Sequence, residues 1–194
     1  MKKLSLFLPI YLLILMGCTN EHPHPQIAPM NLSSSQQEIV DLLSHMGSEF
    51  LFFEYTSGVF TEIKVWVEVY HYGELLGQYN SLGIFSNTPI EAEPLTVSIY
   101  QPGHNKFQWS ISIGAGRSTS EPWIAQNEYN SRAFGSIGEP VEIVAGQEII
   151  IYLSKFTSEA SLTFSGDLQN YLKYPENLAN YTYVHIIKAE FTTR

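Results

Sequence analysis

Alternation of apolar and other side chains with a period of two is the feature that most restricts what this chain can fold into. The clearest example is residues 61–72, where four apolar side chains occupy every second position: Ile63, Val65, Val67 and Val69. Successive side chains of a strand point to opposite faces, so the pattern predicts a strand with one face in a core. The chain therefore contains a sheet with a buried face.

The same period recurs further along the chain. Residues 95–100 and 107–113 alternate on either side of turn-forming residues at 102–105, which predicts a hairpin. Residues 148–155 form a β-rich run with an apolar centre, and residues 181–191 end the chain as another alternating strand. About eight short strands separated by turns, without strand–helix alternation, predict an all-β fold, an antiparallel two-sheet sandwich that is jelly-roll-like.

Two other regions interrupt this pattern. Ser35-Gln36-Gln37-Glu38 matches a capping box, and apolar residues follow at helical spacing as far as Met46. We therefore expect one short N-terminal amphipathic helix packed on a sheet; the alternative is that its apolar side binds a partner. Residues 114–139 are rich in Gly, Ser, Asn and Pro, which predicts long loops with at most short strands.

The N-terminus carries a different signal. Lys2 and Lys3 precede residues 4–16, which contain no charged residue. That stretch is shorter than the ~20 residues that a helix needs to cross a bilayer. A basic start followed by a short apolar run is typical of a secretory signal. Cys18 is the single cysteine of the chain, so it cannot form a disulfide within it.

The residues around this cysteine, Leu15-Met16-Gly17-Cys18, resemble the lipobox of bacterial lipoproteins. The resemblance implies that a diacylglycerol is attached to the Cys18 thiol, that residues 1–17 are removed, and that the protein lies on the extracytoplasmic face of the cell membrane. It covers only the first 18 residues, and Met16 stands where that family more often has a smaller residue. The alternatives are an ordinary secretory signal or a buried helix that happens to end in a cysteine. The rest of the chain resembles no characterised family.

Composition suggests how the folded part is attached. Residues 19–35 contain three prolines and a serine run, which predicts a flexible linker between lipidated Cys18 and a single β-sandwich domain at 36–194. Removal of Lys2 and Lys3 with the signal changes the net charge from −9 to −11, which anionic headgroups repel, so we expect attachment to depend on the lipid. The same acidic balance excludes a nucleic-acid binder, which would carry a basic patch.

No motif predicts a catalytic centre or a cofactor. Residues 114–118 lack the Gly-Lys-Ser/Thr ending of a phosphate loop, and the chain has no His-Glu-x-x-His helix. His22 and His24 have no carboxylate or cysteine partners at a fixed spacing, so they do not predict a metal site. His185 shares one side of its strand with apolar residues, where a core residue is the simpler interpretation and a buried base the alternative. We therefore predict no catalytic residues, no metal and no cofactor.

Aromatic residues supply the candidates for ligand binding. Trp66 and Tyr70 fall on the outward side of the strand at 61–72, spaced so that both rings point the same way. Trp123 lies in a predicted loop. Exposed rings beside carboxylates and amides can stack on the C–H faces of sugars, so these three are candidate ligand-binding residues. The alternative is that the N-terminal helix covers this face and buries Trp66.

Together these features predict a membrane-anchored extracytoplasmic lipoprotein whose β-sandwich is a binding or structural module. Its expected partners are the membrane, through the lipid on Cys18, and either cell-wall glycan or another envelope protein. The alternative is a cell-envelope hydrolase that acts on wall glycan or peptide. Such an enzyme would bring carboxylates or histidines with shifted pKa values together in a cleft.

Overall fold

The computed structural model describes residues 24–56, 59–126, 128–164 and 166–193. The predicted signal sequence and Cys18 lie outside these residues. None of the helices in the described ranges is long and apolar enough to span a membrane. In chain order the elements are β1 (Gln26–Pro29), α2 (Ser34–Ser44), β2 (Ser48–Tyr55), β3 (Glu62–His71), β4 (Glu74–Phe85), β5 (Leu95–Gly103), β6 (Lys106–Ile113), β7 (Gly116–Thr119), β8 (Trp123–Ile124), β9 (Ser131–Ser136), β10 (Val141–Glu142), β11 (Glu148–Thr157), α3 (Asn170–Lys173), the 3-10 helix η1 (Pro175–Asn180) and β12 (Tyr183–Thr192).

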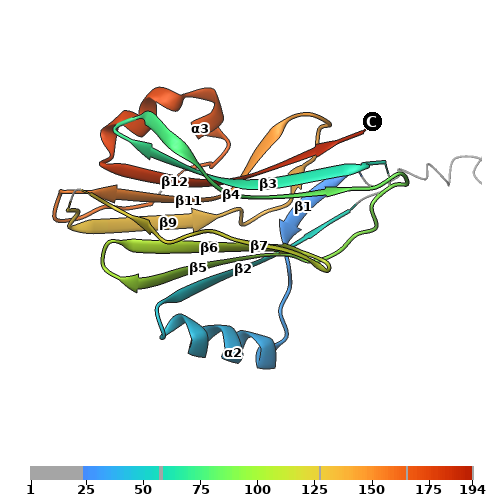
Figure 1. Cartoon of the computed structure of the whole chain (residues 1–194), viewed down its shortest axis with the longest axis horizontal. Helices are drawn as coiled ribbons and strands as arrows, with labels where there is room; N and C mark the ends of the chain where they lie inside the picture. The colour runs from blue at the N-terminus through green and yellow to red at the C-terminus, as the bar shows by residue number, and fades with distance from the viewer. Residues whose placement is uncertain (1–23, 57–58, 127, 165, 194) are drawn as a thin grey trace, which may run out of the picture.

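The strands form two sheets packed face to face (Figure 1). The first sheet has the order β10-β1-β2-β5-β6-β7, with β8 also paired to β6, and the second has the order β4-β3-β12-β11-β9. The described strand pairs are all antiparallel. The prediction of an all-β antiparallel two-sheet sandwich is confirmed.

The core lies between the two sheets and contains the side chains that the period-two pattern selects. In β3 these are Ile63, Val65, Val67 and Val69, all buried. In β12 the alternating set from Tyr183 to Phe191, which includes His185, is also buried. Trp109 in β6 is fully buried between the sheets. The alternation therefore identifies the inner face of these strands correctly.

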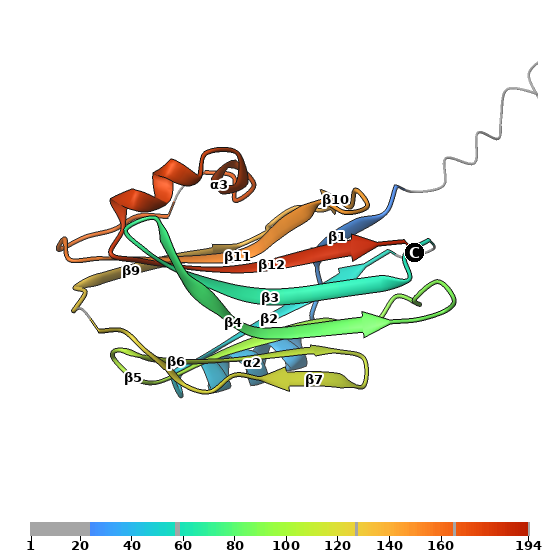
Figure 2. The same ribbon diagram turned by 45° about the horizontal axis from the view of Figure 1, so that its top comes forward.

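Helix α3, η1 and the chain around them cover the outer face of the second sheet (Figures 1 and 2). This cover contacts β11 at a bulge between Ile150 and Tyr152. There the Gln169 carboxamide accepts from the Ile150 N–H at 3.1 Å and donates to the Ile150 carbonyl at 2.8 Å. Strand β11 is consequently buried on both faces, which is why its sequence carries three isoleucines in succession.

Helix α2 packs on the outer face of the first sheet, against β2 (Figure 1). Its N-cap is Ser33, two residues before the predicted Ser35, because the Ser33 hydroxyl and the Gln36 side chain satisfy each other's backbone N–H groups at 3.4 and 2.8 Å. The predicted packing on a sheet is only partial. Val40 and Leu43 are half-buried, whereas Leu42 is 65% exposed.

Three segments depart from the sequence predictions. The linker prediction is wrong for residues 26–29, which form β1 between β10 and β2 with Ile27 fully buried. One apolar residue among prolines gives too little alternation to be recognised. Strand β2 is not among the predicted strands, since its apolar run Phe50–Phe53 hides the period of two. The predicted loop region at 114–139 contains β7, β8 and β9, and β9 pairs with β11 along six residues.

The two ends of the sandwich are built differently. At one end the start of β1 lies beside the end of β2, where the Thr56 N–H donates to the Gln26 carbonyl at 2.9 Å. The C-terminal end of β12 belongs to the same end, since the Tyr55 and Phe191 rings are 5.5 Å apart. The β3–β4 and β5–β6 turns lie at the opposite end, on the left in Figures 1 and 2. We call that opposite end, with the adjoining residues 123–126 and 128–130, the turn end.

Candidate functional site

An aromatic pocket opens at the turn end. It has a volume of about 190 Å³ and is lined by His71, Leu76, Tyr79, Trp123, Ile124, Gln126 and Tyr183. Strand ends position these side chains: β3 and β12 supply His71 and Tyr183, whose backbones are in register. Strand β8 adds Trp123, which pairs with Phe107 of β6. A cavity of about 150 Å³ holds benzene, so this one is large enough for a single six-membered ring.

Large apolar side chains stay exposed around this pocket. Of the residues that line it, Leu76 and Ile124 are each 49% exposed, and Tyr72 in the β3–β4 turn beside His71 is also exposed. Exposed apolar side chains gathered in one place mark interaction sites more often than single ones do. The turn end therefore combines a ring-sized hollow with an apolar rim.

A second hollow of about 570 Å³ adjoins the aromatic pocket, and Gln126 lines both. Its other lining residues come from the β5–β6 turn and the segment before β9: His104, Asn105, Ala125, Glu128, Tyr129 and Asn130. The His104 ring stacks on Tyr129 with centroids 4.5 Å apart. Its Nε2 lies 3.0 Å from the Tyr129 carbonyl oxygen, which fixes the ring at the edge of the hollow.

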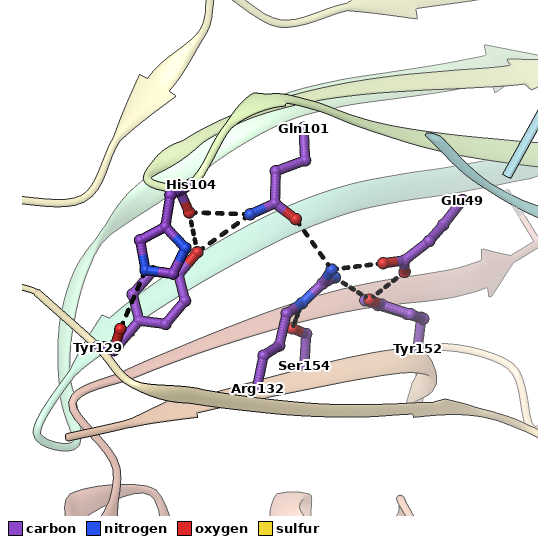
Figure 3. A network of polar contacts seen from close by, with 7 residues as sticks. All are labelled: Glu49, Gln101, His104, Tyr129, Arg132, Tyr152 and Ser154. Atoms are coloured by element: carbon purple, nitrogen blue, oxygen red, sulfur yellow. Dashed lines mark hydrogen bonds and ion pairs between the residues drawn. The ribbon is translucent and has the colours of Figure 1, made fainter. Parts of the chain in front are cut away.

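A polar network runs from this hollow into the space between the sheets (Figure 3). The Gln101 amide donates to the Tyr129 hydroxyl at 3.1 Å and to the His104 carbonyl at 2.8 Å. The Tyr129 hydroxyl also donates to the His104 carbonyl. On its other side the Gln101 oxygen accepts from Arg132 Nη1 at 3.4 Å. Gln101 thus connects the turn end to a buried arginine.

Arg132, in β9, joins the two sheets. Its Nη1 donates to Glu49 Oε1 of β2 at 2.5 Å, and its Nη2 donates to the Tyr152 hydroxyl at 2.7 Å. The Tyr152 hydroxyl donates in turn to Glu49 Oε2 at 2.7 Å, and Arg132 Nε donates to Ser154 at 2.9 Å. Arg132 and Glu49 have only 15% and 23% of their side chains exposed. The pair is a largely buried ion pair with additional hydrogen bonds.

The electrostatics of this network favour a fixed arrangement. Burial raises the pKa of Tyr152 well above its usual value, with Arg132 opposing and Glu49 adding to the effect, so the hydroxyl keeps its proton. Burial alone would lower the pKa of Arg132, but Tyr152 and Glu49 outweigh it and the pKa is raised. The guanidinium is therefore bonded to Glu49 and Tyr152 rather than presented to a ligand. The Arg132 side chain therefore links the two sheets through these hydrogen bonds.

A different polar pair lies deeper between the sheets. His185 of β12 and Trp109 of β6 face each other with ring centroids 5.2 Å apart. The rings of Phe107, Trp123 and Phe156 approach His185 to 4.9, 4.9 and 4.5 Å. Burial, and next the charge of Arg132, lower the pKa of His185 well below its usual value, so the imidazole is neutral near pH 7.

Within the described ranges, neither His185 Nε2 nor Trp109 Nε1 has a hydrogen-bond partner. Each such group forgoes about 1–3 kcal/mol of solvation without compensation. Buried unpaired polar groups are uncommon, and each one calls for a physical explanation. His185 is thus a core residue, which is the simpler of the two interpretations of its strand position. Its Nε2 atom nevertheless lacks a hydrogen-bond partner.

The structure does not bring the three predicted ligand-binding residues together. Trp66 and Tyr70 lie on the outer face of the second sheet, and Trp123 lies at the turn end. Trp66 is only 2% exposed, so the expectation of an exposed ring is wrong for it. Its burial agrees with the alternative, but α2 is not the cause, because that helix packs on the other sheet. The Lys64 ammonium lies 4.8 Å from the centre of the Trp66 ring.

Trp66 and Tyr70 instead hold a buried carboxylate. The indole N–H donates to Glu68 Oε1 at 2.8 Å and the Tyr70 hydroxyl to Glu68 Oε2 at 2.7 Å. Lys188 bridges Glu68 and Glu148 at 2.8 Å each. Burial would raise the pKa of Glu68, but hydrogen bonds from Lys188, Tyr70 and Trp66 outweigh it and lower the pKa. Burial followed by the Glu68 hydrogen bond raises the pKa of Tyr70.

Of the three predicted residues, Trp123 lines the aromatic pocket, where it contacts aromatic residues that were not predicted as site residues. Tyr79 and Tyr183 come from strands 44 residues or more away in the chain, at centroid distances of 6.3 and 5.2 Å from Trp123. Arg132 was hidden in a stretch predicted as loop. The available signal was its position two residues before Phe134, on the same side of a weakly alternating segment. Among the described residues, no group of three or more His, Cys, Asp or Glu is placed to hold a metal ion.

Comparison with known proteins identifies one family. The model of the YgaN domain matches residues 26–191, a span that begins with β1 and ends within β12. No curated protein and no solved structure matches the chain. Both sheets and the turn end fall within the matched span. The chain belongs to the YgaN domain family.

Proposed function

We propose that this protein is a lipoprotein anchored through Cys18 on the extracytoplasmic face of the cell membrane, and that its β-sandwich binds a cell-envelope component at the turn end. The observation that carries the proposal is the aromatic pocket with its apolar rim, at the end of the sandwich opposite Gln26. Ligand sites are concave, mostly apolar, and carry a few polar groups. Cell-wall glycan and another envelope protein are the partners to be distinguished.

The position of the pocket supports this arrangement. Cys18 precedes the first described residue, His24, by six peptide units, which span at most ~20 Å. The strands run about 30 Å from the Gln26 end to the turn end, as judged from the ten residues of β3. An anchor on Cys18 would hold the Gln26 end near the membrane and leave the turn end free for partners.

The anchor is tested by replacing the thiol. Cys18→Ala should leave an uncleaved precursor or release the protein from the membrane, because the acyl chains supply the attachment. Membrane and soluble fractions of cells expressing either form, compared by mass spectrometry, measure this. Normal processing and membrane association of the variant would show that Cys18 is not lipidated.

The binding site is tested by capture from envelope fractions. Residues 19–194, which contain every described element, are immobilised and incubated separately with wall glycan and envelope extract. The double variant Leu76→Glu/Ile124→Glu changes half-exposed rim residues, so it should fold and lose most of the capture. The matched control is Leu42→Glu on α2, which changes an exposed apolar residue elsewhere. Equal capture by the wild type, the double variant and the control would show that the captured component does not bind at the turn end.

A further inference from the structure

We propose that the aromatic pocket binds a single neutral pyranose ring, and that one hydroxyl of this ring reaches past Trp123 to pair with Trp109 and His185. This inference rests on the function proposed above and specifies the ligand of the same site. The juxtaposition that carries it is a ring-sized aromatic pocket whose Trp123 side chain also contacts the two residues with unpaired hydrogen-bonding groups.

The lining of the pocket selects for a neutral ring. Three aromatic side chains, Tyr79, Trp123 and Tyr183, surround it, and the negative faces of such rings attract C–H groups. The described residues that line the pocket include no carboxylate, lysine or arginine. Polar groups are nevertheless present, since the Tyr183 hydroxyl accepts from the Gln126 N–H at 3.2 Å. Apolar faces with hydroxyls at the edge, as in a pyranose, fit this mixture better than a purely apolar ring.

Trp123 connects the pocket lining with the two residues whose groups are unpaired. Trp123 lies 4.9 Å from His185 and 6.4 Å from Trp109, measured between ring centroids. The indole N–H can only donate, and a neutral imidazole offers one donor and one acceptor. A hydroxyl both accepts and donates, so one hydroxyl can pair with both groups. Trp109 and His185 come from opposite sheets, so this hydroxyl would sit between them.

Trp123, which lines the pocket and contacts both rings of the pair, belongs to a short strand. Strand β8 has two residues and pairs with β6 at Lys106 and Phe107. A rotation of the Trp123 ring would open the way inward without separating either sheet. Trp123 would then stack on the ligand while the hydroxyl reaches the pair.

The test follows the Trp109 indole and His185 imidazole resonances of residues 19–194 by NMR, during titration with N-acetylglucosamine or with phenol. The proposal expects the sugar to shift the Trp109 N–H resonance downfield and the His185 resonances with it. Shifts at Trp123 and Tyr183 alone would overturn the hydroxyl pairing while leaving the pocket as a binding site. Binding of phenol without binding of the sugar would overturn the ligand class, and no shift with either probe would overturn the proposal.

Two variants give a second measure. His185→Phe keeps a ring of similar size without nitrogens, and Trp109→Phe removes the indole N–H. Each should weaken sugar binding about tenfold, the equivalent of about 1.4 kcal/mol for one hydrogen bond. Leu42→Ala is the control and should bind as wild type. Unchanged affinity in both ring variants, with native spectra, would overturn the pairing independently of any result from envelope capture.

Discussion

Two buried polar clusters lie between the same two sheets, and they differ in whether their polar groups are paired. Both touch Phe156: the Arg132 guanidinium lies 5.4 Å from its ring and the His185 ring 4.5 Å from it. Arg132 donates to Glu49, Tyr152 and Ser154. The neighbouring His185 and Trp109 each keep one nitrogen without a partner in the described structure.

The paired Arg132 cluster and the unpaired His185–Trp109 groups have different effects on stability and on binding. A buried ion pair with all its hydrogen bonds in place is close to neutral against apolar residues but very sensitive to the loss of one partner. Unpaired buried groups lower stability, and a ligand that pairs with them recovers that free energy on binding. We therefore expect the Arg132 cluster to stabilise the fold and, under the proposal above, the His185–Trp109 pair to take part in ligand binding.

The largest expected effect comes from removing one member of the paired cluster. Arg132→Met leaves Glu49 without its counterion, so the free energy of unfolding should fall by about 3 kcal/mol, as measured by urea denaturation. The control is Arg117→Met, because Arg117 is exposed on β7 and bonds only Ser110 among the contacts described. That change should stay within about 0.5 kcal/mol.

A double variant sharpens the comparison. Arg132→Met with Glu49→Leu removes both charges, so most of the stability lost in the single variant should return. If the double variant were less stable than Arg132→Met alone, the cluster would contribute more than a compensated ion pair and our division of roles would be wrong.

A smaller effect is expected from pH, through the unpaired cluster. The folded-state pKa of His185 lies well below the ordinary 6.5, so below pH 6.5 the unfolded chain binds a proton that the folded chain does not. Stability from this residue is complete above pH 6.5 and declines as the pH falls, by up to ~1.4 kcal/mol per pH unit. Urea denaturation at a series of pH values measures the slope.

His185→Phe is the matching control for this pH dependence. The variant has no group to titrate, so its unfolding free energy should decline less steeply below pH 6.5 than that of the wild type. Identical slopes in the two proteins would mean that His185 is not held neutral in the fold.

The smallest expected effect concerns α2, which lies outside both clusters. Ser33→Ala removes the N-cap and should lower helix stability by about 1 kcal/mol, seen as faster hydrogen exchange of the amides in α2. Ser35→Ala should have little effect, since Ser35 lies inside the first turn. A larger loss of helix stability in Ser35→Ala than in Ser33→Ala would instead show that Ser35 is the N-cap, as the sequence pattern predicts.

Much of the fold could be predicted because alternation reports directly on burial. The inward sets of β3 and β12 follow from a period of two, and a two-sheet sandwich follows from the number of such strands. Strands with weak alternation were not predicted. Strand β1 has one buried residue between prolines, and β2 has apolar residues on both faces.

The candidate site was predictable only in part, because its residues meet through the tertiary fold. Trp123 was recognisable as an aromatic residue in a polar stretch, but its neighbour Tyr79 comes from β4. Trp66 was predicted to be exposed because alternation shows which side of a strand a residue lies on. It does not show whether that side is in water or, as here, covered around the buried Glu68. The Arg132–Glu49 pair joins residues 83 positions apart, a contact that no local pattern contains.

The most direct test of the central claim, that the turn end is the binding site, is amide chemical-shift mapping of residues 19–194 with solubilised wall glycan. We expect shifts concentrated in residues 71–79, 123–126, 128–130 and around Tyr183, with α2 and the Gln26 end unchanged. Shifts confined to α2 or to the outer face around Trp66, with the turn end silent, would contradict it.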